Sequence, residues 1–348
     1  MPEFKNRTSN NTQLNNNFKT NNKTLPKESH SIMYKEDIKV LDCTVRDGGL
    51  MNKWQFSDDF VRSVYNACVE AGIDYMEIGY LSSEKAFDRS VYGPWKFCRQ
   101  DDLERIVGKN ETKLKLSAMA DIGRIELDDI PYKADSLLDM IRVACYVHQV
   151  DKAIALAHHC MDKGYEVCIN MMAVSTVNEH ELDEALKDIA ASRVKTFYAV
   201  DSFGSMYIES IQKLVRKYQA ALPGKEIGIH AHNNMQMAMS NTYTAIMEGC
   251  TMLDATLLGL GRGAGNCPIE ILIAFLKNPK YRLLPLLQAI QDYIHPLQQE
   301  IDWGYHIPYL VSGAMNAHPR KSMEWMESDR KNDFVSFLRE MHDNEILE

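Results

Sequence analysis

Two histidines separated by one residue, His230 and His232, are the residues of this sequence best suited to chemistry. They end an apolar run, IGIHAH, that is typical of a buried strand. Side chains at positions i and i+2 of a strand point to the same face, about 6.6 Å apart along the chain. Both imidazoles can therefore bind one metal ion. On this pair alone, metal binding and simple core packing are both open interpretations.

A second group of reactive residues, Arg46-Asp47-Gly48-Gly49, closes the first apolar run of the chain. An aspartate at the end of a strand can reach toward a site, and the glycines leave the backbone open for close approach of a ligand. Gly48 is therefore a candidate for substrate binding. Asp-Gly-Gly is also common in turns, and by itself that interpretation is favoured.

A third group is the glycine-rich stretch 259–266, which follows the last apolar run. One interpretation is a flexible loop. The other is a loop whose backbone amides, such as that of Gly263, approach an anionic substrate, while Asn266 offers a carbonyl oxygen to a metal.

These groups must be positioned by regular elements, and the chain from residue 38 alternates short apolar runs with amphipathic stretches. The apolar runs predict eight strands, at residues 38–44, 73–80, 113–122, 137–146, 165–174, 194–200, 226–232 and 251–260. The intervening stretches predict helices at residues 57–72, 99–107, 151–163, 179–191, 205–220 and 235–249. Eight such units fit a closed (β/α)₈ TIM barrel in the α/β class better than an open doubly wound sheet. We expect the barrel at residues 36–277.

In such a barrel the three groups converge, because the first, seventh and eighth strands are neighbours and active sites lie at the strands' C-terminal ends. One carboxylate, two imidazoles and an amide oxygen suit Mn²⁺, Mg²⁺, Co²⁺ or Zn²⁺ with positions left open for a substrate. We favour Mn²⁺ or Mg²⁺ because no thiolate joins the set.

Composition limits what else the chain can do. A net charge of −9 argues against nucleic acid or an anionic membrane as the main partner. No run of about 18 apolar residues and no secretory signal is visible, so we expect a cytoplasmic protein with eight reduced cysteines.

Residues 1–35 are polar and predict a disordered tail. Residues 278–348 predict a helical C-terminal extension, with helices at about 281–301 and 305–346 broken by Pro308 and Pro319.

The runs LDCTVRDGG, IGIHAHNN and LGLGRGAGN together resemble the DRE-TIM metallolyases, a superfamily of metal-dependent carbon–carbon lyases and condensing enzymes. The resemblance spans residues 38–275 and is strongest, over 227–275, to the 4-hydroxy-2-oxovalerate aldolases. It implies that Asp47, His230 and His232 bind the metal, with Asn266 either as a further ligand or as a neighbour that holds the ligands in place. It also implies that Arg46 stabilises an enolate, with Glu77 as a supporting carboxylate near the substrate and Ser202 in a substrate loop.

The sequence departs from those aldolases at Leu50, where they carry a histidine that acts as base. Leucine cannot move a proton, so we expect another residue to do so, and Tyr305, His306 and Tyr309 in the tail are the candidates. Helix packing is an equally open interpretation of these three. We interpret His158, His159 and His318 as surface or packing residues.

The expected function is cleavage or formation of a carbon–carbon bond next to a small 2-oxo acid, with an aldehyde as the second substrate or product. A Claisen condensation of an acyl-CoA with a 2-oxo acid is a second possibility, and an inactive barrel that binds a partner is a third. The helical tail predicts a homodimer. The resembled aldolases dock an aldehyde dehydrogenase there, but the different tail sequence here predicts no particular dehydrogenase.

Overall fold

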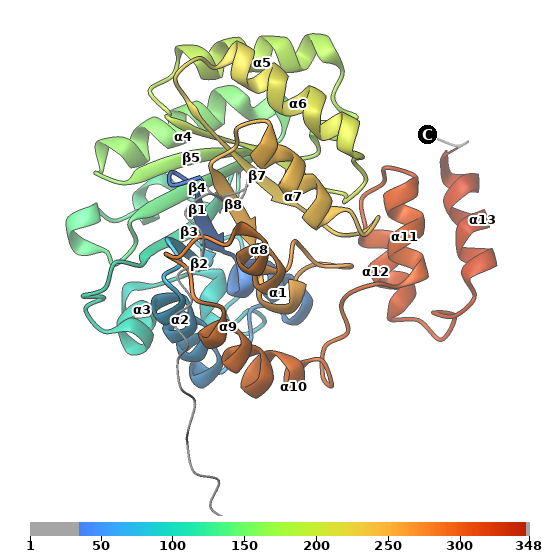
Figure 1. The fold of residues 1–348 in the computed structure, drawn as a ribbon, viewed down its shortest axis with the longest axis horizontal. Coiled ribbons are helices and arrows are strands. Elements are labelled where there is room, and N and C mark those ends of the chain that lie inside the picture. Colours follow the sequence, from blue (N-terminus) through green and yellow to red (C-terminus); the bar gives the residue numbers. More distant parts are fainter. Residues whose placement is uncertain (1–34, 346–348) are drawn as a thin grey trace, which may run out of the picture. The chain divides into compact units, whose positions relative to one another are not determined.

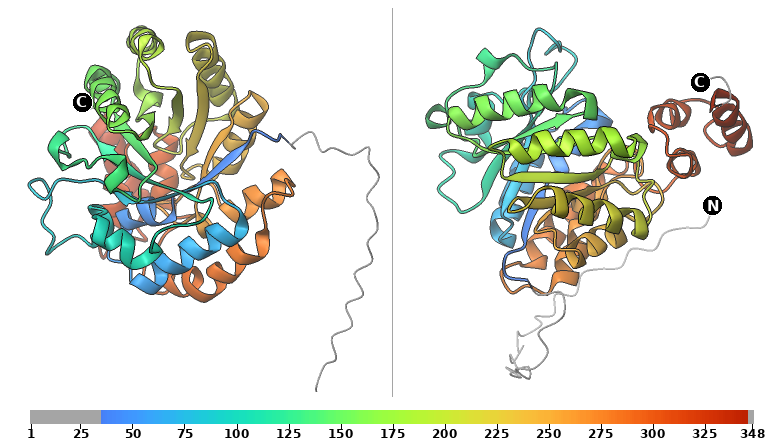
Figure 2. Two further views of the ribbon diagram at one scale, coloured as in Figure 1. Left: turned by 90° about the vertical axis from the view of Figure 1, so that its left-hand side faces the viewer. Right: turned by 90° about the horizontal axis from the view of Figure 1, so that it is seen from above.

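The structure is a computed structural model that describes residues 35–345, with the side chains of the last two left out. The predicted disordered tail lies outside the described residues, except for Lys35. Eight parallel strands close into a barrel in which each strand pairs with the next and β1 pairs with β8. The prediction of a TIM barrel is confirmed, and Figures 1 and 2 show helices on the outside of the strands.

All eight predicted strands are present, because each apolar run is buried on both faces as parallel strands require. They are β1 Lys39–Asp42, β2 Tyr75–Tyr80, β3 Lys115–Asp121, β4 Met140–Cys145, β5 Glu166–Met171, β6 Thr196–Asp201, β7 Glu226–Ala231 and β8 Met252–Ala255. The predicted helices are also present. They are α2 Asp58–Ala71, α3 Gln100–Val107, α4 Val150–Asp162, α5 Glu179–Ala191, α6 Ile208–Ala221 and α7 Ala238–Met247.

Helix α2 shows how local sequence sets these boundaries. The Ser57 side chain accepts a hydrogen bond from the backbone of Phe60 and caps the N-terminus. Gly72 ends the helix in the left-handed conformation, with φ of 75°. A Cβ at this position would lie 2.6 Å from the carbonyl oxygen of Lys280, so both the φ angle and the close packing require glycine here.

Two helices, α1 (Thr44–Asn52) and α8 (Ile269–Leu276), were not predicted. The first one changes the interpretation of the site, because Arg46 and Asp47 lie in the opening turns of α1 and not at the end of β1. Gly48 and Gly49 do not form a turn. They lie inside the helix, where Leu260 and Trp54 pack directly on them.

The predicted C-terminal helices are shorter than expected. They are α9 Leu283–Ala289, the π-helical turn η7 Ile290–Ile294, α10 His295–Leu297, α11 Ile307–Ala314, α12 Arg320–Met326 and α13 Phe334–Glu345. Pro308 does not break a helix; it lies in the first turn of α11, where proline is tolerated. Helix α9 packs on α2 of the barrel, whereas α11 and the helices after it share a small apolar cluster that includes Trp325 and Phe337.

Helix α11 is attached to the C-terminal end of the barrel by specific polar contacts. The Asn234 side chain, just after β7, donates to the carbonyl oxygen of Tyr309 at 3.3 Å. Ser205, just after β6, donates to the Asn316 side chain at 2.6 Å. These contacts bring the segment after α11 next to the ends of the strands where the predicted site lies.

The cysteines and the apolar character of the helices also bear on the sequence expectations. All eight cysteines are free and buried, as predicted. Within residues 35–345, none of the helices combines the length and the apolar character needed to cross a membrane.

Candidate active site

Asp47, His230 and His232 meet at the C-terminal end of the barrel. One donor atom from each lies within 4.8 Å of the other two, which is close enough for all three to surround one cation. His230 is in β7, His232 follows that strand directly, and Asp47 is in α1. The two imidazole rings are nearly perpendicular, with centroids 5.0 Å apart. The structure therefore brings together the three residues that the sequence predicted as ligands.

The electrostatic environment keeps Asp47 and His232 ready to bind a cation. Burial favours the neutral form of Asp47, but Arg46 and weaker contributions from His232, His230 and Arg262 together outweigh it, and the pKa of Asp47 is lowered. Burial lowers the pKa of His232 well below its ordinary value, so this imidazole is neutral. An ionised carboxylate and a neutral imidazole are the protonation states that metals require.

Asn266 completes the group and shows whether these donors suit a divalent cation. Its Nδ2 donates to Oδ2 of Asp47 at 2.6 Å and lies 3.3 Å from the carbonyl oxygen of Leu260. Its Oδ1 is buried and has no hydrogen-bond partner among the described residues. A buried carbonyl oxygen without a partner is unfavourable, and a cation beside Asp47 would satisfy it. The donor set therefore fits a divalent ion.

The glycine-rich loop allows this close approach. A Cβ on Gly261 would lie 2.1 Å from Nδ2 of Asn266 and 2.5 Å from Oδ2 of Asp47. Any larger residue at position 261 must displace one of these side chains. Gly263 has a left-handed φ of 61° and packs against the ring of Tyr309, and Gly48 packs against Leu260. Neither of these two glycines lines the cavity at the site, and their role in substrate binding stays a prediction.

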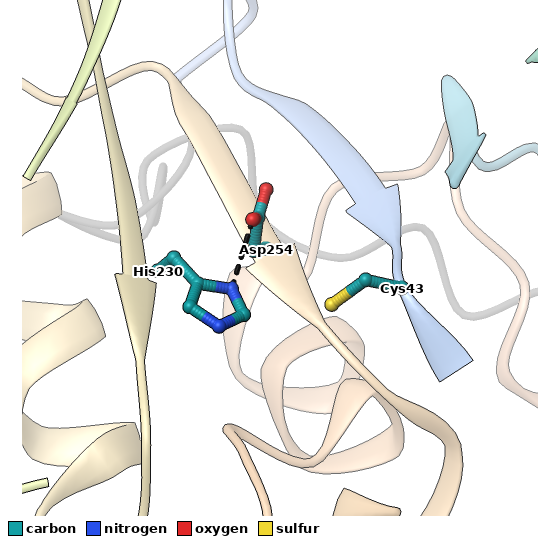
Figure 3. A group of neighbouring side chains, drawn as sticks. All are labelled: Cys43, His230 and Asp254. Atoms are coloured by element: carbon teal, nitrogen blue, oxygen red, sulfur yellow. Dashed lines mark hydrogen bonds and ion pairs between the residues drawn. The ribbon is translucent and has the colours of Figure 1, made fainter. Parts of the chain in front are cut away.

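A second trio, Cys43, His230 and Asp254, shares the imidazole of His230 with the first (Figure 3). Oδ2 of Asp254 is 2.9 Å from Nδ1 of His230, which leaves Nε2 for the candidate metal. Burial raises the pKa of the Cys43 thiol well above its ordinary value, and the thiol donates to the carbonyl oxygen of Ala255. We therefore assign this trio to orienting His230 and not to a second ion.

Asp254 continues into a buried charge network inside the barrel. Arg142, in the middle of β4, donates to Asp254 at 2.5 Å and to Glu77 at 3.1 Å. Glu77 in turn accepts from Nε of Arg46 at 2.6 Å, and Arg46 donates to Asp47 at 2.5 Å. The network joins both halves of the candidate metal site and holds the guanidinium of Arg46 rigidly beside it.

Glu77 is a member of this network. It lies within β2, fully buried, and does not line the cavity. Its carboxylate holds Arg46 and Arg142, and its predicted place near the substrate stays a prediction. Arg142 and Asp254 were missed by sequence analysis, although a charged residue in the middle of an apolar strand is a signal for a buried partner.

A small cavity of about 70 Å³ opens beside these groups. Its polar lining includes Arg46, Ser202, His230, His232, Arg262 and His318. Ser202, one of the predicted substrate-binding residues, is thus at the cavity. Its hydroxyl accepts from the backbone of Ala173 at 2.8 Å and is held in place.

The comparison with known protein families agrees with this geometry. The sequence profile of the HMGL-like family matches residues 37–293, which include the whole barrel. The chain belongs to the HMGL-like family. The expectation of a DRE-TIM metallolyase relative is thereby confirmed.

Individual HMGL-like relatives are moderately similar. A 4-hydroxy-2-oxovalerate aldolase of Bacillus cereus is 29% identical, with 77% of this chain and 80% of the relative aligned. An oxaloacetate decarboxylase of Mycobacterium tuberculosis is 34% identical, with 69% and 70% aligned. A crystal structure of the N-terminal domain of a candidate aldolase from Bacteroides vulgatus has a TM-score of 0.73 at 29% identity, covering 86% of this chain and 100% of that one. These names agree with the predicted enzyme class, a carbon–carbon lyase.

The tail beyond the HMGL-like match does not place the predicted proton-transfer residues at the cavity. The Tyr305 side chain is exposed, His306 pairs with Asp302 at 2.7 Å, and Tyr309 is buried against Gly263. None of these tail residues lines the cavity, and their role in proton transfer stays a prediction. Leu50, where the resembled aldolases carry a base, is half-buried against the core and does not line it either.

His318 is the tail residue that does reach the cavity of this HMGL-like protein. Its Nε2 lies 3.3 Å from Nη1 of Arg262, and its ring contacts that of Phe203 edge to face. His318 therefore packs against Phe203, as a packing residue would, and also lines the cavity, which the sequence did not predict. No local pattern marks it, because its position depends on how the segment between α11 and α12 folds over the barrel.

Proposed function

We propose that this HMGL-like protein is a divalent-metal-dependent lyase that cleaves or forms a carbon–carbon bond beside a 2-oxo acid through an enolate. The observation that carries the proposal is the convergence of Asp47, His230 and His232 with the unpartnered Oδ1 of Asn266, next to the fixed guanidinium of Arg46. These four donors would hold the ion. We favour Mn²⁺ or Mg²⁺, because carboxylate and amide oxygens contribute and the nearest thiol, Cys43, is protonated.

A bound divalent ion would supply positive charge to a chelated 2-oxo acid as an enolate develops. The residues of this chain supply the remaining steps. Arg46 already uses Nε and Nη1 on Glu77 and Asp47, and its Nη2 has no hydrogen-bond partner among the described residues. Because Arg46 lines the cavity, Nη2 can donate to the enolate oxygen without reorganisation.

The names of the relatives support two versions of this reaction. Aldol cleavage requires a base that removes the proton of a hydroxyl group, and Leu50 supplies none. Decarboxylation of a 2-oxo acid that carries a second carboxylate requires no such base, because the departing carboxylate leaves its electron pair on the enolate. The relative named oxaloacetate decarboxylase is the one at 34% identity. The aldolase-like reaction remains our first candidate because several relatives carry that name, and the decarboxylase is the second.

The geometry disfavours both a Claisen condensation and an inactive barrel. A cavity of about 70 Å³ is small compared with ordinary ligand pockets of roughly 300–1,000 Å³, which favours a small 2-oxo acid over an acyl-CoA. An inactive barrel would have no use for a buried ionised carboxylate at Asp47 beside an amide oxygen of Asn266 that has no hydrogen-bond partner among the described residues. Such buried groups are costly to retain. A cytoplasmic location, a homodimer and an aldehyde as second product stay predictions from the sequence.

Deuterium exchange tests the proposal directly. Protein stripped of metal and reloaded with Mn²⁺ is incubated with pyruvate in D₂O, and methyl deuteration is followed by NMR. We expect exchange that requires the ion and that His232→Gln abolishes. His158→Gln, a half-buried histidine of α4 outside the site, is the matched control and should exchange like the wild type. Absence of exchange in metal-loaded wild-type protein contradicts the proposed function.

A further inference from the structure

Three arginines lie at or below the cavity, and Arg262 differs from the other two in having no acidic partner. Arg46 is paired with Asp47 and Glu77, and Arg142 with Glu77 and Asp254. No carboxylate within the described part of the chain lies within 4.0 Å of the Arg262 guanidinium.

Among the described residues, the guanidinium of Arg262 makes its polar contacts with neutral groups. Nη2 donates to the carbonyl oxygen of Ser202 at 2.8 Å, and Nη1 lies 3.3 Å from Nε2 of His318. Its Nε is buried and has no hydrogen-bond partner among the described residues. A partly buried cation with neutral partners and an unsatisfied donor is unfavourable unless an anion completes it.

His318 fixes the direction in which this guanidinium points. Burial, together with the charges of Arg262 and Arg320, lowers the pKa of His318 to about 4, so the ring is neutral and can accept a hydrogen bond. Because Ser202 and His318 hold its two terminal nitrogens, the guanidinium of Arg262 has a fixed orientation at the cavity wall before any ligand binds. His318 acts as a positioning residue.

The local charges point to a second negative group on the substrate. The three guanidiniums of this region are balanced by the three carboxylates of Asp47, Glu77 and Asp254. A bound divalent cation would add two positive charges. The single carboxylate of pyruvate, or of a hydroxy-2-oxo acid without a second carboxylate, neutralises only one of them. A substrate with two carboxylates balances the site.

We propose that Arg262 binds a second carboxylate, so that the site accepts four- or five-carbon 2-oxo acids with a carboxylate at each end. This inference rests on the proposed function and names its substrate class. The 2-oxo acid end would lie at the candidate metal donors and Arg46, and the distal carboxylate at the Arg262 guanidinium. The backbone N–H of Arg262 donates to Asp47 at 3.3 Å, which ties this residue to the candidate metal donors. Guanidinium and carboxylate match as a two-point pair.

A matched pair of ligands isolates the distal charge. 2-Oxoglutarate and 5-methyl-2-oxohexanoate share shape and the 2-oxo acid end, but the second carries an isopropyl group in place of the distal carboxylate. Their affinities are measured by calorimetry on Mn²⁺-loaded full-length protein, for the wild type, Arg262→Gln and Arg262→Lys. Arg124→Gln, which removes an exposed arginine paired with Asp121 outside the cavity, is the control.

We expect the wild type and Arg124→Gln to bind the dicarboxylate at least about 30-fold more tightly than its isostere, as for a buried charge pair. Arg262→Gln should reduce this preference to less than about threefold, and Arg262→Lys should restore part of it. Equal affinities in the wild type, or a loss of both ligands by the same factor in Arg262→Gln, would overturn the inference. Deuterium exchange into pyruvate, measured in parallel, separates the two proposals. Exchange without a preference for the dicarboxylate would contradict the substrate class alone. Absence of exchange would contradict the proposed function and, with it, this inference.

Discussion

Oδ2 of Asp254 lies 2.9 Å from Nδ1 of His230, and the same oxygen accepts a hydrogen bond from Arg142. Burial alone would raise the pKa of Asp254, but Arg142 and His230 together outweigh it and the pKa is lowered. An ionised carboxylate on Nδ1 fixes the tautomer of His230 with Nε2 free and makes it a stronger donor to a metal.

Asp254→Asn should therefore weaken Mn²⁺ binding about 10- to 100-fold, the range typical for groups that orient a metal-binding histidine. The titration of metal-free protein with Mn²⁺, followed by electron paramagnetic resonance, measures this. Asp74→Asn is the control, because Asp74 lies at the opposite end of the barrel and bonds to the backbone of Val40. An unchanged Mn²⁺ affinity in Asp254→Asn would show that the contact is only structural.

Arg46→Lys tests the role of the guanidinium. Lysine keeps the charge but cannot bond to Asp47 and Glu77 while presenting a further N–H to the cavity. We expect turnover to fall on the order of 10²- to 10³-fold, as for loss of a donor to a developing oxyanion. Deuterium exchange into pyruvate at saturating substrate measures this fall. A decrease below about tenfold would show that Arg46 does not stabilise the enolate.

Gly261→Ala tests the packing of the glycine-rich loop. The new Cβ would contact the Asn266 amide at 2.1 Å and must break its hydrogen bond to Asp47. We expect Mn²⁺ affinity to fall at least about tenfold, because a ligand and its neighbour are both displaced. Gly224→Ala is the comparison. It has open space around it but a φ of 80°, so it should lower stability by about 1 kcal/mol and leave metal binding intact. Equal Mn²⁺ affinities in the two variants would contradict this.

The low pKa of His318 predicts a pH dependence of stability. Its pKa is about 4 in the folded protein, against an ordinary value of 6.5, so between these values the unfolded chain binds more protons. The contribution is fully present above pH 6.5 and is lost as the pH falls toward 4. Because the ring is partly exposed, we expect a contribution on the order of 1–2 kcal/mol.

His318→Gln, which has no proton to gain, should lack this contribution. Urea unfolding gives the free energy of unfolding of each protein at about pH 7.5 and about pH 4.5. This free energy should fall further between the two pH values in the wild type than in His318→Gln, and the difference between the two falls is the contribution of His318. Parallel decreases in the two proteins would show that His318 is not buried neutral.

The sequence was sufficient for the barrel and for the meeting of Asp47 with the two histidines, because continuous apolar runs define parallel strands and strand order then defines neighbours. It failed at α1, where two adjacent glycines suggest a turn. The glycines serve instead to admit Leu260 and Trp54. Whether glycine provides a turn or a close packing contact depends on partners that are distant in the sequence.

The tail was less predictable for a similar reason. Tyr305 and His306 lie in a segment that resembles a functional one, yet Pro308 starts a new helix just after them and they remain outside the cavity. His318 reaches the cavity through the docking of α11 on Asn234 and Ser205. Such tertiary contacts leave no periodic pattern in the sequence.

The hydrogen bond between Asp47 and Asn266 joins residues 219 positions apart. During synthesis on the ribosome, a nascent chain that has already exposed Asp47 still lacks both histidines and the amide. A metal site of this composition would therefore be complete only after nearly the whole barrel has emerged.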